Sequence, residues 1–410
     1  MEREAEGNGQ QPSEVRILGS RFSRVFEELE QRNRMRIGIP RETRPDETRV
    51  AATPDVVRKY VERGAEVVIE PGAGARAFFA DAVYRAAGAE VGEGAWAAGL
   101  VLKVQPPTPA EAALLSRGAT LVSFLYPESN PETMAALARG AVTALAMESI
   151  PRIARAQKMD ALSSMANLAG YKAVLEAANA FGRFFPLLMT AAGTIPPAQV
   201  LVIGAGVAGL SAIVTARRLG AVVRAFDPRP AVKEQVQSLG ARFLDLPLEA
   251  AETAGGYAAA QSEEFLRIER ELLAAQMDEV DVVITTALIR GQPAPVLITE
   301  EMVKAMKPGS VIVDLAVEQG GNCEVSRPDE VVSAHGVTVI GWSNLAARVP
   351  VHASTLYARN VQHLVNVLWG EAGLALDFDD EVVAGAAALH EGRVLRSDAE
   401  ESVPTTGGGA

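Results

Sequence analysis

Short apolar runs alternate with amphipathic segments along most of this chain. In the N-terminal half, each of four runs rich in β-branched residues is followed by a helical pattern, and a fifth run closes the series; the runs lie at 35–40, 66–70, 100–104, 120–125 and 142–148. Gly64, Gly118 and Gly140 each follow a helical pattern, where a helix-terminating residue is expected. This alternation predicts a mostly parallel sheet covered by helices.

A second series of the same kind follows a long helical pattern at about 163–181. Its apolar runs lie at 199–206, 222–227, 280–288, 309–317 and 336–344, and a second long helical pattern follows at 355–369. Two series joined by two long helices predict an α/β protein with two Rossmann-like lobes of mostly parallel sheet and a cleft between them. The second long helix is expected to return the chain to the first lobe.

These patterns divide the chain into four segments. We expect a first Rossmann-like lobe at 35–162 plus 350–380 and a second Rossmann-like lobe at 163–349. Residues 1–34 are polar and are interpreted as a disordered extension. Beyond about residue 380 the sequence becomes rich in Ala, Gly and Glu, so 381–410 is expected to be a flexible tail.

One uncharged segment, 184–216, is long enough to cross a bilayer. It contains Gly193, Pro196, Pro197 and a glycine cluster, and a lipid-exposed helix would leave the backbone groups broken there unsatisfied. We therefore expect a buried helix end, a loop, a buried strand and a glycine turn, and no transmembrane span.

Composition narrows the choice of partners and compartment. Lysine and arginine number 39 against 51 acidic residues, a net charge of −12, which argues against a nucleic-acid surface. The N-terminus has no apolar core of a secretory signal. Cys323 is the only cysteine, so an internal disulfide is impossible and a reducing cytoplasm is the expected compartment.

The strongest motif is "VLVIGAGVAGLSA", in which a G-x-G-x-x-G pattern follows an apolar strand and opens a helix. The glycines allow a tight turn, a close approach to a pyrophosphate and helix–strand packing, and the helix N-terminus attracts the phosphates. Such a turn alone can be purely structural, but the next strand ends in Asp227, 23 residues after the first glycine, where an acid holds ribose hydroxyls and repels a 2′-phosphate. Arg224 and Arg229 flank Asp227 and would favour NADP; with Asp227 present, NAD is preferred. The motif makes 163–349 the NAD-binding lobe, with the nucleotide in the cleft. The expected contacts are Gly204, Ala205, Gly206, Val207, Ala208, Gly209 and Asp227.

A polar stretch, "PRIARAQKMDALSS" (151–164), lies between an apolar run and the first long helix. It combines arginines, a glutamine and an aspartate, without a histidine or a second carboxylate. The simplest interpretation makes Arg152 and Arg155 surface residues and Asp160 the N-cap of the helix, with Ser163 as its local partner. Positioning of a ligand is compatible with that capping role.

Eight motifs together resemble the NAD(H)-binding domain I of proton-translocating NAD(P) transhydrogenase, a relative of alanine dehydrogenase. The resemblance runs from about residue 35 to 378 and rests on "MRIGIPRETRPDETRVAATP", "VLKVQPP", "PRIARAQKMDALSSMANLAGYKAV", "VLVIGAGVAGLSAI…VVRAFDPRP", "AAETAGGYA", "DVVITTALIRGQPAPVLIT", "VIVDLAVEQGGNCE" and "ASTLYARNVQHL". The chain ends before any membrane helix, so it resembles the separate alpha subunit that some bacteria make.

The resemblance implies specific roles for residues of these motifs. Arg152, Gln157, Asp160 and Ser163 would form the loop beside the nicotinamide, with Ser163 paired to Asp160. Tyr257 would be at the tip of a mobile loop that folds over the nucleotide. Thr286 and Ala287 would contact the nucleotide. No metal is implied.

The resemblance also implies partners. The family works as a homodimer of this domain with an NADP(H)-binding domain III and a membrane domain II that moves protons. The expected activity is that of the Si-specific/Re-specific transhydrogenase, located in the cytoplasm and peripheral on the inner face of the plasma membrane through its partner subunits. Direct hydride transfer between NAD(H) and NADP(H) needs two nicotinamides held about 3–3.5 Å apart and no general base.

The main alternative is an alanine dehydrogenase-like, NAD-dependent amino-acid oxidoreductase. Arg49 and Lys103 match the positions where that family holds its substrate, but its acid/base histidine is replaced by Tyr126 in "LVSFLYPESN". The four histidines lie elsewhere, and loss of a proton shuttle costs about 10²–10⁴-fold in rate. A second alternative is a catalytically silent nucleotide sensor, which would not need the 151–164 stretch.

Overall fold

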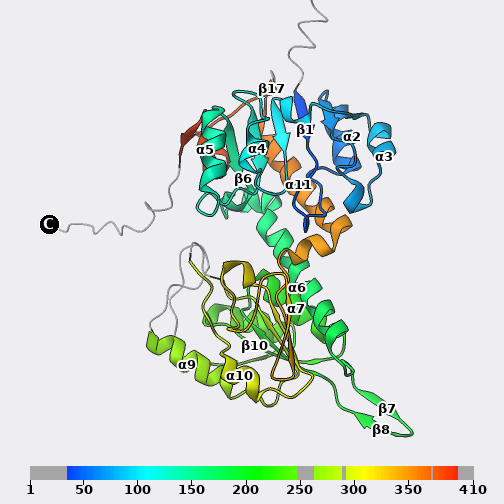
Figure 1. Ribbon diagram of the computed structural model, residues 1–410, viewed down its shortest axis with the longest axis vertical. Coiled ribbons are helices and arrows are strands. Elements are labelled where there is room, and N and C mark those ends of the chain that lie inside the picture. The colour runs from blue at the N-terminus through cyan, green and yellow to red at the C-terminus, as the bar shows by residue number, and fades with distance from the viewer. Residues whose placement is uncertain (1–34, 247–262, 289–291, 371–372, 396–410) are drawn as a thin grey trace, which may run out of the picture.

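Two sheets covered by helices form two lobes that are stacked along the long axis of the molecule (Figure 1). The computed structural model describes residues 35–246, 263–288, 292–370 and 373–395. Both sheets are mostly parallel, so the predicted class, an α/β protein with two Rossmann-like lobes, is confirmed. No helix within the described ranges is long and apolar enough to cross a membrane.

The first lobe contains an eight-stranded sheet in the order β19-β18-β6-β5-β4-β1-β2-β3. Its strands from β1 to β6 pair in parallel, whereas β18 and β19 pair antiparallel. The bounds are β1 (Arg36–Ile39), β2 (Glu66–Ile69), β3 (Glu90–Val91), β4 (Leu100–Leu102), β5 (Thr120–Ser123), β6 (Thr143–Ala146), β18 (Ala387–His390) and β19 (Arg393–Val394). The helices of this lobe are α2 (Pro54–Glu62), α3 (Asp81–Ala86), α4 (Pro109–Ala112), α5 (Pro131–Arg139) and α12 (Glu381–Ala386).

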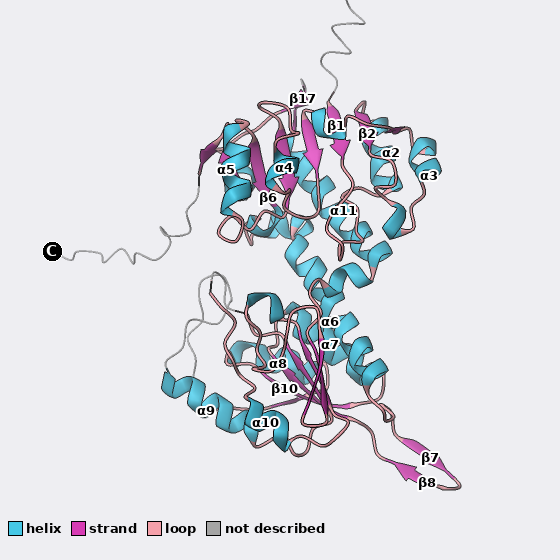
Figure 2. Ribbon diagram, viewed as in Figure 1, coloured by secondary structure: helices cyan, strands magenta, loops and turns pink. Residues whose placement is uncertain are grey.

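The second lobe contains a seven-stranded sheet in the order β11-β10-β9-β12-β13-β15-β14, in which only β14 is antiparallel. The bounds are β9 (Gln199–Ile203), β10 (Val222–Phe226), β11 (Arg242–Phe243), β12 (Val282–Thr285), β13 (Val311–Asp314), β14 (Val331–Ala334) and β15 (Val337–Ile340). The helices are α7 (Val207–Arg218), α8 (Lys233–Ser238), α9 (Glu263–Ala274) and α10 (Glu300–Ala305). Figure 2 distinguishes the strands of each sheet from the helices that cover them.

Two long helices join the lobes: α6 (Ala161–Ala180) and α11 (Pro350–Leu368). α6 packs against both α7 and α11. Both helices were expected from the sequence, and α11 begins with a proline, a residue suited to the first helical position. The central strands β12 and β13 are buried at every residue, as expected for parallel strands with helices on both faces.

The structure corrects one prediction about the ends of elements and confirms another. The tail predicted at 381–410 is wrong for 381–395. There β18 and β19 extend the first sheet, α12 packs near β6, and Val382, Val383 and Leu389 are buried. The rest of that tail, 396–410, and the predicted extension at 1–34 lie outside the described residues. Gly140 ends α5 with φ −75°, and the left-handed conformation falls instead on Ala141, at φ +51°.

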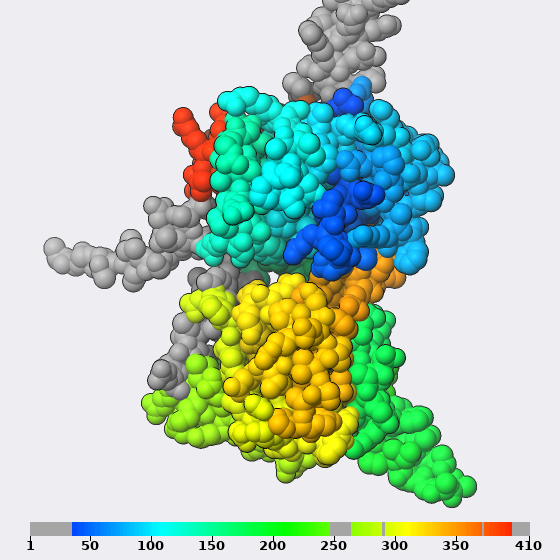
Figure 3. Space-filling model, in the orientation of Figure 1, coloured from blue at the N-terminus to red at the C-terminus, as the bar shows by residue number. Residues whose placement is uncertain are grey.

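The segment predicted as a buried helix end and loop contains an exposed hairpin. Strands β7 (Leu188–Thr190) and β8 (Gly193–Ile195) pair antiparallel and project from the second lobe as an arm (Figures 1 and 3). Phe184 is 52%, Leu187 55%, Met189 72% and Ile195 44% exposed. The absence of charge in this segment therefore does not reflect burial within the chain. A second small hairpin joins β16 (Trp369–Gly370) and β17 (Gly373–Leu374).

Candidate nucleotide site

Two glycines of the turn between β9 and α7 have no room for a side chain, and a third has free space beside it. Gly204 has φ +93°, and a Cβ there would lie 2.5 Å from Oγ1 of Thr286. A Cβ at Gly209 would lie 1.8 Å from the carbonyl oxygen of Gly204. At Gly206, by contrast, a Cβ would meet nothing within 4 Å. The turn therefore needs glycine for its own packing at two positions and leaves free space at the third.

The first turn of α7 offers N–H groups beside that free space that bond to no other residue within the described ranges. The 12-residue helix begins at Val207, directly after Gly206, and its first turn has no acidic side chain. Its partial positive charge is therefore available to an anion. Val207 and Ala208 lie in this first turn, and Ala205 lies in the glycine turn just before it.

Asp227 directly follows β10 and is 5% exposed, and both of its carboxylate oxygens accept hydrogen bonds. Oδ2 accepts a hydrogen bond from the N–H of Ala205 at 2.7 Å, which ties the acid to the glycine turn. Arg229 donates from Nε to Oδ1 and from Nη2 to Oδ2, both at 2.9 Å. Arg224 instead bonds Gln276 and Glu279 at 2.8 and 2.6 Å. Of the two arginines that flank the acid in sequence, only Arg229 covers it.

Thr286 and Ala287 support the turn from β12. Thr286 donates from Oγ1 to the carbonyl oxygen of Gly204 at 3.1 Å. The N–H of Ala287 donates to Oδ1 of Asn322 at 3.0 Å. Asn322 is itself held by Asp314, whose side chain is fully buried. The carboxylate of Asp314 accepts hydrogen bonds from the backbone N–H groups of Asn322 and Cys323. No local sequence signal marks this supporting role of Asn322 and Asp314.

The polar stretch predicted beside the nicotinamide forms a 3₁₀ segment, η4 (Ala154–Met159), at the start of α6. Asp160 caps α6, because its carboxylate accepts from the N–H of Ser163 at 2.8 Å and from its Oγ at 2.5 Å. The pairing of Ser163 with Asp160 is thus present. Arg152 and Gln157 have exposed side chains.

Two contacts hold this stretch against other elements of the first lobe. Arg155 forms a paired ion contact with Asp380, at 2.8 Å between Nη1 and Oδ2, at the start of α12. Asn360 of α11 donates from Nδ2 to the carbonyl oxygen of Lys158 at 2.8 Å. Arg155 is therefore not an unattached surface residue, although its side chain is exposed.

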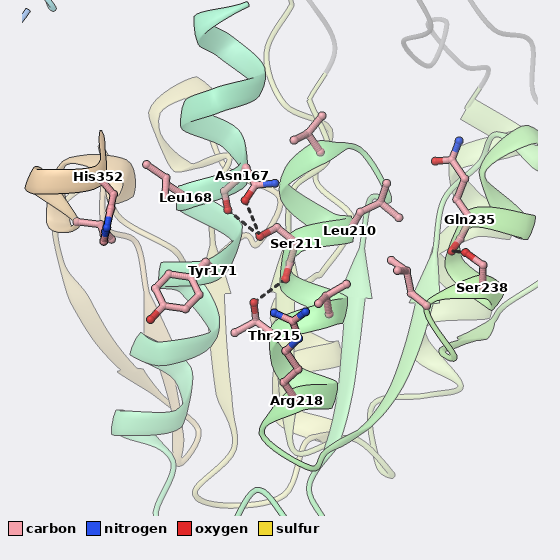
Figure 4. A pocket seen from close by; sticks show the side chains of 14 residues that line it. Asn167, Leu168, Tyr171, Leu210, Ser211, Thr215, Arg218, Gln235, Ser238 and His352 are labelled. Atoms are coloured by element: carbon pink, nitrogen blue, oxygen red, sulfur yellow. Dashed lines mark hydrogen bonds between the residues drawn. The ribbon is translucent and has the colours of Figure 1, made fainter. Parts of the chain in front are cut away.

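Helix α6 connects the polar stretch with the glycine turn. A Cβ at Gly170 would lie 2.0 Å from the carbonyl oxygen of Ala208, so the two helices touch at the first turn of α7. Ser211 of α7 donates from Oγ to the carbonyl oxygen of Asn167 at 2.7 Å, a bond drawn in Figure 4. Since an α-helix rises 1.5 Å per residue, Asp160 stands about 15 Å along α6 from this contact. The structure thus places both halves of the candidate site along one helix.

A groove of about 760 Å³ lies along this helix pair, with Asn167 and Ser211 among its lining residues (Figure 4). It is lined mainly by residues of α6, α7 and α8, including Tyr171, Leu210, Arg218 and Gln235. Asp227 and Gln157 are not among its lining residues. Tyr257 and the predicted mobile loop at 250–258 lie outside the described residues.

A buried polar cluster in the first lobe contains the two cations that an amino-acid substrate would need. Nζ of Lys103 lies 2.9 Å from Oε2 of Glu42, and Arg49 pairs with Glu47 at 2.5 Å. Tyr126, in the loop after β5, has φ +43° and stacks on Phe124. The histidines are in other elements: His335 beside Glu300, His352 and His363 on α11, and His390 on β18.

Comparisons with known proteins agree with this geometry. Two family models match, "Alanine dehydrogenase/PNT, N-terminal domain" over residues 38–169 and "Alanine dehydrogenase/PNT, C-terminal domain" over 173–397. The chain is 49% identical over 375 residues to the first of the polypeptides that make up NAD(P) transhydrogenase subunit alpha in Rhodospirillum rubrum, covering 88% of this chain and 98% of that protein. It is 32% identical to alanine dehydrogenase of Bacillus subtilis, over 80% of this chain and 83% of the relative.

A solved structure shows the same arrangement. The crystal structure of transhydrogenase from Sinorhizobium meliloti matches with a TM-score of 0.80 and 46% identity, covering 88% of this chain and 99% of that chain. The resemblance inferred from the eight motifs is therefore confirmed. The chain belongs to the alanine dehydrogenase/PNT family.

Proposed function

We propose that this chain is the NAD(H)-binding alpha subunit of a Si-specific/Re-specific, proton-translocating NAD(P) transhydrogenase. Hydride would pass directly between NAD(H) bound here and NADP(H) on a partner domain III, coupled to proton movement by a membrane domain II. One observation carries the proposal: α6 joins a polar loop that contains no histidine to the glycine turn and Asp227. The similarity to transhydrogenases that are 49% and 46% identical to this chain supports the same conclusion.

The residues present fit a dinucleotide. The free space at Gly206 and the N–H groups of the first turn of α7 suit a pyrophosphate, and Asp227 suits the adenosine ribose hydroxyls. Those hydroxyls would take the place of Arg229 on Asp227. When bound, the nicotinamide supplies the hydride that is transferred.

The polar loop can position a nicotinamide without moving protons. Gln157 and Arg152 present exposed hydrogen-bonding side chains, and Asp160 is held by Ser163 at the start of a rigid helix. We assign these four residues to holding the ring and its carboxamide, and Tyr257 to a loop that covers them. Because hydride transfer between two nicotinamides releases no proton, such positioning groups are sufficient.

The exposed arm supports assembly as a homodimer. An isolated two-stranded hairpin is marginally stable in water, yet β7–β8 exposes Met189, Leu187 and Ile195 to solvent. Its apolar surface is suited to packing on a second copy of the chain. Attachment to partner subunits would place the protein at the inner face of the plasma membrane.

A second candidate function is NAD-dependent amino-acid oxidoreduction, because alanine dehydrogenase is a relative and the chain has Arg49 and Lys103, which match the substrate-holding positions of that family. Against it, Tyr126 occupies the loop after β5 where that reaction needs an acid/base histidine.

The test mixes the chain with an isolated NADP(H)-binding domain III and follows reduction of an NAD analogue by NADPH. A parallel reaction measures NADH oxidation with pyruvate and ammonium. Transfer in the first mixture and none in the second is expected. Activity only in the second would replace the proposal by amino-acid oxidoreduction, and nucleotide binding without either activity would indicate a sensor.

A further inference from the structure

The lobes are also joined by a polar contact between two loops that are about 300 residues apart in sequence. One loop, 44–49, follows β1 in the first lobe, and the other, 343–348, follows β15 in the second. Thr48 donates from Oγ1 to the carbonyl oxygen of Ala347. In Figure 3 the dark-blue segment of the first lobe meets the yellow and orange face of the second at this place.

The side chain of Asn344 uses both ends of its amide in this contact. Its Oδ1 accepts a hydrogen bond from Nη2 of Arg49 at 3.0 Å. Its Nδ2 lies 3.0 Å from Oε2 of Glu47 and 3.2 Å from Oδ2 of Asp46. One neutral side chain of the second lobe therefore bonds to a cation and two carboxylates of the first lobe.

The partners of Asn344 are fixed within the first lobe. Glu47 is completely buried and also accepts from Nε of Arg49 and Nε2 of Gln105, both at 2.7 Å. Burial favours the neutral form of Glu47, but Arg49 and Gln105 outweigh it and lower its pKa to about 2. The pair is thus permanently charged at neutral pH, and Asn344 bonds to a rigid group.

The backbone of Asn344 narrows the choice of residue at this position. Its φ of +50° and ψ of +43° are left-handed, a conformation in which asparagine, aspartate and glycine are the favoured residues. Glycine has no side chain to bridge the lobes, and an aspartate would face the carboxylates of Glu47 and Asp46. Only the amide satisfies both the backbone and the opposite charges.

We propose that Asn344 is a positioning residue that locks the second lobe onto the buried Glu47–Arg49 pair. The lock sets the distance between the polar loop at 151–164, on the first lobe, and the glycine turn with Asp227, on the second. This role rests on the proposed function, because the distance matters only when both loops act on one dinucleotide.

The first experiment measures the distance between the lobes in the nucleotide-free chain. Spin labels are attached to cysteines at Arg58→Cys on α2 and Arg267→Cys on α9, whose native side chains are 51% and 60% exposed. The natural Cys323 is 2% exposed and should not react. Asn344→Gly should shift or broaden the distance distribution. His335→Gly is the matched control, since His335 is also left-handed, at φ +52°, but bonds to Glu300 within its own lobe.

The second experiment separates positioning from folding. Asn344→Gly should slow single-turnover hydride transfer by about tenfold or more, because displacement of reacting groups by about 1 Å can cost 10²-fold. Its affinity for ADP, which would use the glycine turn and Asp227 of the second lobe, should stay within about threefold of wild type. Asn344→Asp should be slower still, and adding Asp46→Asn should recover some of the loss, because the new amide can donate to the new carboxylate.

Three results would overturn the proposal. They are an unchanged distance distribution in Asn344→Gly, a transfer rate equal to that of the His335→Gly control, and a complete lack of recovery in the Asn344→Asp, Asp46→Asn double variant. The distance measurement needs no nucleotide, so it tests the lock even if the wild-type chain fails to transfer hydride. That failure would count against the proposed function alone.

Discussion

Substitution of Gly170 by alanine should uncouple the two halves of the candidate site. The added Cβ would lie 2.0 Å from the carbonyl oxygen of Ala208, and Cβ atoms are essentially never found within 3.0 Å of such a neighbour. Because the obstacle is backbone of the glycine turn, it cannot rotate away as a side chain would. α6 and α7 must therefore separate by about 1 Å, which also shifts the loop before α6 relative to the turn.

The expected cost in stability is small compared with the cost in rate. Overpacking a core contact costs about 1–3 kcal/mol, and replacing glycine by alanine in a helix returns about 1 kcal/mol, so the net loss is about 0–2 kcal/mol. A displacement of about 1 Å between reacting groups costs about 10²-fold in rate. Hydride transfer should thus fall strongly in a protein that remains folded.

The assay combines single-turnover transfer to domain III with urea unfolding of the free chain. Gly182→Ala is the matched control, because a Cβ at Gly182 meets nothing within 4 Å and its φ is not positive. A wild-type transfer rate in Gly170→Ala, with unchanged unfolding, would refute the argument that α6 sets the spacing.

Three further outcomes are expected. Gln157→Asn should lower transfer by about 10²-fold while NADH affinity, measured by calorimetry, changes less than about threefold, because the lost contact acts mainly in the transition state; an unaffected rate would make the loop an ordinary connection. NADH should bind at least about tenfold more tightly than NADPH because of Asp227, and equal affinities would point to Arg229 as the determinant. Burial and the nearby Asp227 carboxylate raise the pKa of Glu269 from 4.5 to about 7. The protonated form of Glu269 therefore stabilises the folded chain at low pH. This contribution to the free energy of unfolding, at most about 3 kcal/mol, is lost as pH rises from about 4.5 to 7. Glu269→Gln should flatten that section of the stability profile measured by urea unfolding, and an unchanged slope would contradict a buried neutral carboxyl.

The central architecture could be predicted from the sequence because it follows from local patterns. Runs such as 200–203 and 282–284 are apolar throughout and separated by helical patterns, which is the signature of parallel strands buried on both faces. The turn at Gly204 and the acid at Asp227 have a fixed spacing, and Asp160 precedes its helix as an N-cap should.

Features that depend on contacts between distant segments could not be predicted in this way. The Ala-rich segment 381–395 has a weak strand signal, and its place at the edge of the first sheet depends on pairing with β6. The hairpin at 188–195 is apolar without being buried within the chain, so a composition argument placed it inside. Asn344 bonds residues almost 300 positions away, and no periodicity marks it.

The contact between Gly170 and Ala208 has a consequence for how the chain can change in evolution. Each residue of an α-helix turns the chain by about 100°, because 3.6 residues make one turn. An insertion or deletion of one residue between Asp160 and Gly170 would therefore rotate the polar loop by more than a quarter turn around α6. Relatives that keep both halves of the site should differ in side chains along this segment but not in its length.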